Sequence, residues 1–135
     1  MTDVHVDRPT VTVADIRHSP VMTIRSGDTL WDAWQLMFVS GMRNLAVVDE
    51  AGSSIGVLSD RAILTDLPIT EKHLAGRRVS DVMASPGSVT DDTCAQTAAS
   101  RMARHCVDAL PIVTDAGRPI AMLTAADLIE WAARA

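Results

Sequence analysis

An internal repeat is the feature of this sequence that most constrains its fold. The segment from Leu45 to Ser59 aligns without a gap with the segment from Leu110 to Thr124, 65 positions later, and Val13–Ile16 aligns with Val79–Val82 at nearly the same offset. Repeats of this kind are supersecondary units that bury their apolar faces against each other. The sequence therefore predicts two copies of one unit. They are repeat 1 over residues 11–67 and repeat 2 over residues 79–133, joined by a linker over 68–78.

The hydrophobic pattern of each copy predicts a β-α-β-β-α unit. Apolar residues recur with a helical period from Thr29 to Phe38. Thr29 and Thr93 each begin a capping-box pattern, with Asp32 or Gln96 three positions later. Short apolar runs separated by a glycine-containing turn predict a hairpin in each copy. The hairpins are expected over residues 45–58 and 110–123, and the closing helices over 60–67 and 125–133.

The way in which two such units pack follows from their sheets. One unit alone leaves one face of its small sheet as exposed apolar surface. Two copies packed sheet to sheet about a pseudo-twofold axis bury both faces and leave two related clefts between them. We therefore expect an α+β fold in which a ligand binds between the repeats.

Composition and charge exclude several classes of function. A net charge of −5 and an aromatic content of 3% argue against a nucleic-acid binder. The chain has no apolar run approaching the roughly twenty residues of a membrane span and no secretory signal, so we expect a cytoplasmic protein that does not bind membranes. Its two cysteines and four histidines lack ligand spacing, which predicts no metal site. No catalytic motif is present, so we expect neither an enzyme nor a cofactor.

The repeated motifs resemble a tandem pair of cystathionine-β-synthase-type (CBS) domains over almost the whole chain. The motifs lie at Val13–Pro20 and its counterpart Val79–Pro86, in the helix from Asp28 to Met37, at Leu110–Gly117 and at Leu123–Leu128. The resemblance implies a regulatory module that acts on a protein partner of unknown identity. It also implies an adenosine-containing ligand, with AMP, ADP, ATP and S-adenosylmethionine as the candidates.

Thr124 and Asp127 form the pair that this resemblance assigns to a ribose. A hydroxyl at a strand-to-helix junction and an aspartate three residues later can bind the sugar hydroxyls together, because the carboxylate accepts two charge-assisted hydrogen bonds. Repeat 1 has Ser59, but Ala62 takes the place of the aspartate. We therefore predict one competent cleft, in repeat 2. By motif position its walls are Val82, Met83, Pro86, Gly87, Ser88, Ala109, Leu110, Pro111, Thr124 and Asp127.

Two interpretations of this site stay open. Thr124 and Asp127 also fit a helix cap, which needs no ligand. Arg43 and Arg61 are the candidate phosphate contacts, whereas Asp108 in repeat 2 would repel a phosphate. The chain is therefore either a sensory module that binds an adenosine-containing ligand in the cleft of repeat 2, or a ligand-free structural module for dimerisation or scaffolding.

Aromatic residues on the first long helix predict a homodimer. Trp31, Trp34 and Phe38 follow one flank of this helix. Core packing accounts for Trp34, but Trp31 is hard to bury within one chain because other apolar residues already fill the inward face. Large aromatic side chains are favoured anchors of protein interfaces. We therefore expect a dimer interface at these three residues, with a monomer that exposes Trp31 as the alternative.

Overall fold

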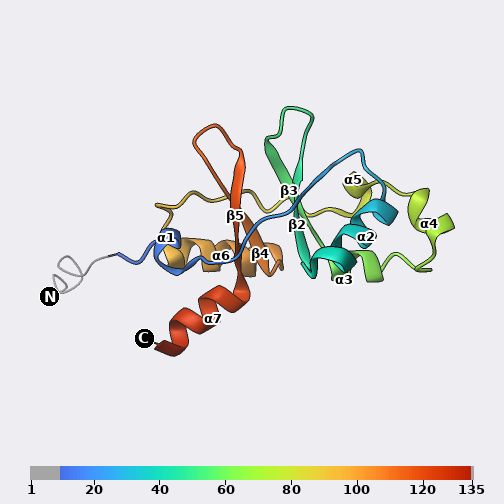
Figure 1. Cartoon of the computed structure of the whole chain (residues 1–135). Helices are drawn as coiled ribbons and strands as arrows, with labels where there is room; N and C mark the ends of the chain where they lie inside the picture. Colours follow the sequence, from blue (N-terminus) through green and yellow to red (C-terminus); the bar gives the residue numbers. More distant parts are fainter. Residues whose placement is uncertain (1–9, 135) are drawn as a thin grey trace, which may run out of the picture.

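The computed structural model describes residues 10–134, which form two small sheets with helices around them (Figure 1). The strands are β1 (Thr23–Arg25), β2 (Asn44–Val48), β3 (Ser54–Ser59), β4 (Ala109–Val113) and β5 (Pro119–Thr124). The helices are α1 (Val13–Ile16), α2 (Leu30–Ser40), α3 (Asp60–Leu64), α4 (Glu71–Ala75), α5 (Val79–Val82), α6 (Ala95–His105) and α7 (Ala125–Arg134).

Two hairpins meet at the centre of the molecule. β2 pairs antiparallel with β3 in the first sheet, where β1 also lies parallel to β2, and β4 pairs antiparallel with β5 in the second sheet. Ala46 and Val57 of the first sheet form one buried cluster with Ala109 and Met122 of the second. This contact removes apolar faces of both sheets from water. The predicted α+β fold with sheet-to-sheet packing is therefore confirmed.

The second sheet lacks a full counterpart of β1, which the repeat predicts. Val89 makes only an isolated parallel bridge to Ile112. In the first sheet, the amide of Ala46 donates to the carbonyl of Met22 at 2.9 Å. The residue 65 positions after Ala46 is Pro111, which has no amide hydrogen to donate. The edge of β4 therefore cannot form the same series of hydrogen bonds that pairs β1 with β2.

The two predicted capping boxes differ in outcome. The Thr29 hydroxyl accepts a hydrogen bond of 3.1 Å from an amide in the first turn of α2, as the pattern predicts. The prediction for Thr93 is wrong, because its hydroxyl accepts instead from the amide of Thr90, and α6 begins after Cys94. The closing helix of repeat 1 is also shorter than predicted and ends at Leu64.

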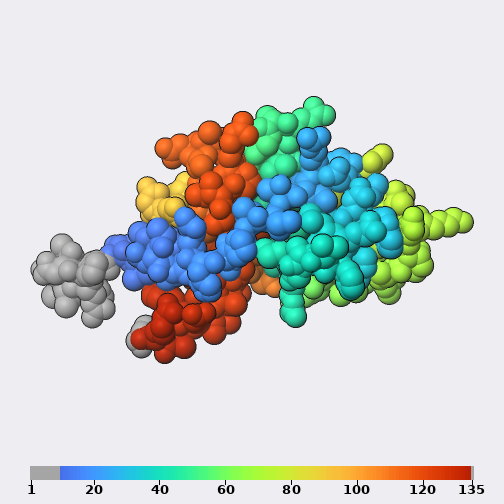
Figure 2. All heavy atoms as spheres, in the orientation of Figure 1, coloured from blue at the N-terminus to red at the C-terminus, as the bar shows by residue number. Residues whose placement is uncertain are grey.

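The first short helix of each repeat packs on the other half of the molecule. Val13 and Ile16 of α1 are buried in the core of the second half, together with Leu110 and Leu123. Val79 of α5 is buried in the core of the first half. Figure 2 shows the blue residues of α1 lying beside the red and orange residues of the second half. A repeat in the sequence is therefore not a packing unit, because each half needs a segment from the other.

This crossing carries two loops into the space between the halves. The loop after α1 is fixed by an ion pair in which Arg17 Nε lies 2.6 Å from an oxygen of Asp91, a hydrogen bond that raises the pKa of Arg17. Farther along, the amide of Met122 in β5 donates to the carbonyl of Ser19 at 3.3 Å. The loop after α5 pairs with β3 through Ala84. These loops form walls of the two clefts described below.

An ion pair between the linker and repeat 1 is expected to make the stability of the fold sensitive to acid. Arg77 Nε donates to Asp66 at 2.9 Å, and this bond, followed by the charges of Arg77 and His73, lowers the pKa of Asp66 below its ordinary value of 3.8. A carboxyl group whose pKa is lower in the folded than in the unfolded state stabilises the folded protein. This contribution is complete above the pKa of the unfolded state and is lost as the pH falls through the pKa of the folded state. The contribution is thus present at neutral pH and absent in strong acid.

We therefore expect Asp66→Asn to lower the free energy of unfolding at neutral pH. The difference from wild type should shrink as the pH falls below about 4. Urea unfolding at several pH values measures this difference. Glu50→Gln, at an exposed position in the β2–β3 turn, is the control and should match wild type throughout. A difference that stays constant from neutral pH into strong acid would show that Asp66 stabilises the fold by some other means.

Candidate functional site

The junction of β5 and α7 forms a reciprocal cap. The Thr124 hydroxyl accepts a hydrogen bond of 3.1 Å from the amide of Asp127, and the Asp127 carboxylate accepts one of 3.0 Å from the amide of Thr124. This arrangement satisfies backbone donors that a helix start otherwise leaves unpaired. Thr124 and Asp127 therefore do form a helix cap, as the capping interpretation predicts. A carboxylate has about four acceptor positions, so the cap leaves capacity for other donors.

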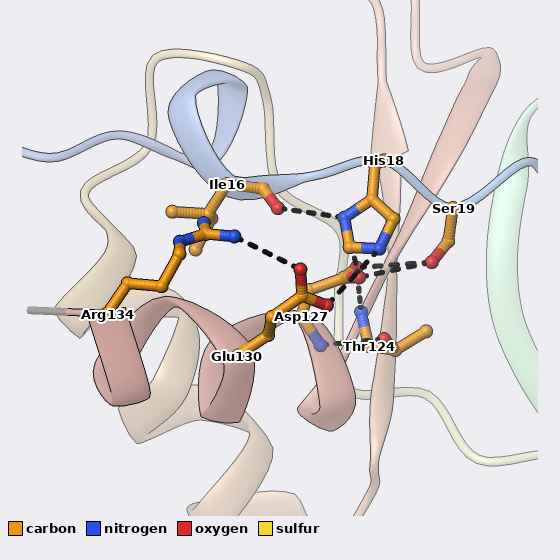
Figure 3. Close-up of polar contacts among 7 residues, drawn as sticks. All are labelled: Ile16, His18, Ser19, Thr124, Asp127, Glu130 and Arg134. Atoms are coloured by element: carbon orange, nitrogen blue, oxygen red, sulfur yellow. Dashed lines mark hydrogen bonds and ion pairs between the residues drawn. The ribbon is translucent and has the colours of Figure 1, made fainter.

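Two side chains from the loop after α1 use that capacity (Figure 3). The Ser19 hydroxyl lies 3.2 and 3.3 Å from the two carboxylate oxygens of Asp127. The Nδ1 atom of His18 lies 3.3 Å from one of them, and its Nε2 atom lies 3.7 Å from Glu130. Asp127 is 2% exposed and is the only charged residue buried among residues 10–134. Burial of a carboxylate is tolerated here because the Thr124 amide and the Ser19 hydroxyl both hydrogen-bond to it.

A cleft of about 340 Å³ opens beside this cap. We call it the Thr124 cleft. Its size is at the lower end of the range for pockets that bind small molecules. Asp127 itself does not line the cleft, whereas Ser19 and Thr124, which hydrogen-bond to its carboxylate, do. The lining residues are Ser19, Pro20, Gly41, Met42, Arg43, Asn44, Asp108, Met122, Thr124, Ala125 and Ala126.

A second cleft of about 270 Å³ occupies the repeat-related position. We call it the Ala62 cleft. The Ser59 hydroxyl caps α3 by accepting from the amide of Ala62 at 3.0 Å, but no carboxylate completes the pair. Arg61 Nη2 lies 3.8 Å from Asp108, across the cleft. The lining residues are Asn44, Val57, Ser59, Arg61, Ala62, Thr65, Val82, Ala84, His105, Cys106, Val107 and Asp108.

The residues predicted from motif position do not line one cleft. The structure brings Thr124 and Asp127 together, but Val82 lies in the Ala62 cleft because α5 packs on the first half. Met83 packs against the core of the first half. Pro86, Gly87 and Ser88 lead to the bridge at Val89 and line neither cleft, and Ala109, Leu110 and Pro111 are buried within β4. None of these eight residues is among those that line the Thr124 cleft.

The structure separates the two arginines predicted as phosphate contacts. Arg43 lines the Thr124 cleft, and Arg61 lines the Ala62 cleft. Asp108 lines both clefts, so the charge of Arg43 in the Thr124 cleft is balanced by one carboxylate. Ser19, which the sequence analysis did not assign to the site, contacts Asp127 directly. The Ser-Pro pair that follows α1 was visible in the repeat, but nothing local in the sequence tells which half this loop contacts.

The aromatic residues predicted at a dimer interface differ in exposure. Trp31 and Trp34 are half-buried against the core of the first half. Phe38 is 86% exposed and Val39 is 83% exposed at the end of α2. The repeat-related residues on α6 are Ala103 and Arg104, so this apolar surface belongs to the first half alone. Contiguous exposed apolar surface of this kind marks sites of protein association.

Among residues 10–134, no three side chains of the histidine, cysteine, aspartate and glutamate types lie close enough together to hold a metal ion. No helix within the same range combines the length and the hydropathy that crossing a membrane requires.

The CBS domain family model matches the chain twice, over residues 13–68 and 79–134. The chain is 30% identical over 116 residues to homoserine O-acetyltransferase of Methanococcoides burtonii. The match covers 86% of this chain but 23% of the relative, so the chain spans about a quarter of the length of that protein. The two matched stretches correspond to the two copies of the repeat.

Solved structures with the same fold include CBS domain pairs with bound ligands. One is the CBS domain pair of protein MJ0100 in complex with 5′-methylthioadenosine and S-adenosylmethionine. It has a TM-score of 0.76 and 20% identity, over 93% of this chain and 98% of that one. Another is CBSX2 in complex with AMP, with a TM-score of 0.72 and 26% identity, over 91% of this chain and 96% of that one. The resemblance inferred from the repeat is confirmed.

Proposed function

The chain belongs to the CBS domain family, and on that premise we propose that it is a regulatory module that binds an adenosine-containing ligand in the Thr124 cleft. The observation that carries this proposal is the asymmetry of the two clefts. Asp127 is a buried carboxylate bound to two residues of the Thr124 cleft wall, Ser19 and Thr124, and the repeat-related residue in the other cleft is Ala62. A carboxylate that accepts both hydroxyls of a ribose contributes about 1.5–3 kcal/mol per charged hydrogen bond. The Ala62 cleft lacks that contribution.

The charges at the Thr124 cleft favour a ligand without a phosphate chain. Arg43 and Asp108 are the only charged residues that line it within the described chain, and their charges cancel. A triphosphate would meet no net positive charge in this cleft. 5′-Methylthioadenosine is neutral and S-adenosylmethionine is cationic at its sulfonium, and both are ligands of the structurally similar pair from protein MJ0100. We therefore expect ligands of this type to bind more tightly than AMP, and AMP to bind more tightly than ADP and ATP.

Signalling by such a module requires two conformations with different ligand affinity. The Thr124 cleft lies between the halves, with Arg43 and Asn44 from one side and Met122 and Thr124 from the other. A ligand that contacts both sides favours the relative position of the halves that it fits best. In a homodimer joined through α2, that position is transmitted to the partner subunit and to the regulated protein.

A thermal-shift screen tests the proposal. A ligand at about a hundred times its dissociation constant stabilises the folded state by ~2.7 kcal/mol, which raises Tm by roughly 5–10 °C for a chain of this size. We expect this rise with 5′-methylthioadenosine and S-adenosylmethionine, and a smaller one with ATP. Free adenine, which has no sugar hydroxyls, is the control and should leave Tm near its starting value. The absence of a shift with every nucleoside and nucleotide would contradict the proposal.

A structural module for dimerisation is the second candidate, and one observation favours it. The protein's own groups, among them the backbone amide of Thr124 and the Ser19 hydroxyl, already hydrogen-bond to the Asp127 carboxylate, so the site needs no ligand to be stable. This candidate predicts a dimer that no adenosine compound stabilises. The thermal-shift screen therefore separates the two candidates.

A further inference from the structure

Ser19 lines the Thr124 cleft, and its hydroxyl contacts the carboxylate of Asp127. The hydroxyl lies 3.2 and 3.3 Å from the two carboxylate oxygens (Figure 3). Asp127 itself is not among the residues that line the cleft. A vicinal diol that binds a carboxylate places one hydroxyl near each oxygen. Ser19 thus supplies, from a residue of the cleft wall, the type of donor that a ribose would supply.

The hydrogen bonds of Asp127 determine which donor a ligand can replace. The amide of Thr124 is fixed by the cap at the start of α7, so it stays. Ser19 and His18 come from one loop, and His18 is 60% exposed. The carbonyl of Ser19 accepts from the amide of Met122, which fixes the backbone while leaving the side chain free to rotate between staggered positions. The Ser19 hydroxyl can therefore leave Asp127 by rotation of its side chain alone.

We infer that Ser19 is an internal competitor for the sugar position, and that the ribose of the ligand replaces its hydroxyl on Asp127. This inference rests on the proposed function and makes Ser19 a determinant of affinity. A ligand with a single sugar hydroxyl exchanges one hydrogen bond for another and gains little. A ribose replaces one donor with two and gains a charge-assisted bond. Because of this competition, a ribosyl ligand gains a net hydrogen bond at Asp127 and a 2′-deoxyribosyl ligand does not.

Calorimetric titration of adenosine and 2′-deoxyadenosine tests the inference. Wild type should bind adenosine about tenfold or more tightly than 2′-deoxyadenosine. Ser19→Ala removes the competitor and should tighten binding of both compounds by about tenfold. Ser19→Cys keeps a side chain of similar size with a weaker donor, and should fall between wild type and Ser19→Ala.

Ser85→Ala is the matched control. Ser85 is the repeat-related serine, and its hydroxyl donates to the carbonyl of Ile55 at 3.4 Å, away from Asp127. This variant should bind both nucleosides as wild type does. Unchanged or weaker binding by both Ser19 variants would overturn the inference and leave the proposed function intact, because Ser19 would then be a bystander or a direct ligand contact. If neither nucleoside bound wild type or any variant, the proposed function would fail, and the competition with it.

Discussion

Replacing Asp127 with alanine is expected to weaken binding of adenosine ligands by about tenfold or more. The ribose loses two charge-assisted hydrogen bonds but no longer has to displace the Ser19 hydroxyl, so the net loss is one such bond, worth about 1.5–3 kcal/mol. The variant should also lose about 1–2 kcal/mol of stability, because the amide of Thr124 loses its carboxylate acceptor. The Thr124 hydroxyl can still accept from the amide of residue 127. Titration calorimetry measures the affinity, and urea unfolding measures the stability.

Asp127→Asn separates these two losses. Asparagine keeps the size of the side chain and one carbonyl oxygen, so it can still accept from the amide of Thr124, but it carries no charge. We expect stability closer to wild type and binding that is weaker by at least about tenfold. Wild-type affinity in either variant would mean that the ribose does not bind at Asp127, and the site assignment would have to be withdrawn.

The second large effect is expected at the exposed end of α2, where Phe38→Glu should convert a homodimer into a monomer. Phe38 is 86% exposed, so the substitution hardly changes the stability of an isolated chain. In a symmetric dimer each copy contributes the same residue, and a charge is then introduced twice into an apolar interface. At about 2 kcal/mol for each interface anchor, the dimer dissociation constant rises by roughly 1000-fold.

Sedimentation equilibrium of wild type, Phe38→Glu and Ala103→Glu measures this effect. Ala103 is the repeat-related residue on α6, is also exposed, and lies on a helix whose outer face is polar. We expect wild type and Ala103→Glu to dimerise alike. Phe38 is a cleaner probe than Trp31, because Trp31 is packed against the core and its removal also costs stability. A Phe38→Glu variant that dimerises as tightly as wild type would exclude this surface as the interface.

The repeat allowed much of the fold to be predicted, because its apolar pattern is local and occurs twice. The helix capped by Thr29 and the two hairpins follow from periodicity and turn residues alone. The missing first strand of the second sheet also has a local cause, since Pro111 stands where Ala46 donates a hydrogen bond. That consequence becomes clear only when the register between the strands is known.

The site was harder to predict, because its walls come from both halves of the chain. The pair of Thr124 and Asp127 and the loss of the aspartate at Ala62 are visible in the aligned repeats. The contact of Ser19 with Asp127 spans 108 positions and depends on the exchange of α1 between the halves. For the same reason, motif position assigns Val82 to the cleft of Asp127, whereas in the structure it lines the Ala62 cleft. Tertiary packing, rather than local propensity, decides these assignments.

A crystal structure of the chain grown with 5′-methylthioadenosine tests the central claim most directly. The account predicts one ligand per chain, with both ribose hydroxyls on the Asp127 carboxylate, the Ser19 side chain rotated away, and no ligand in the Ala62 cleft. A ligand in the Ala62 cleft alone, or a ligand in the Thr124 cleft whose ribose does not contact Asp127, would contradict it.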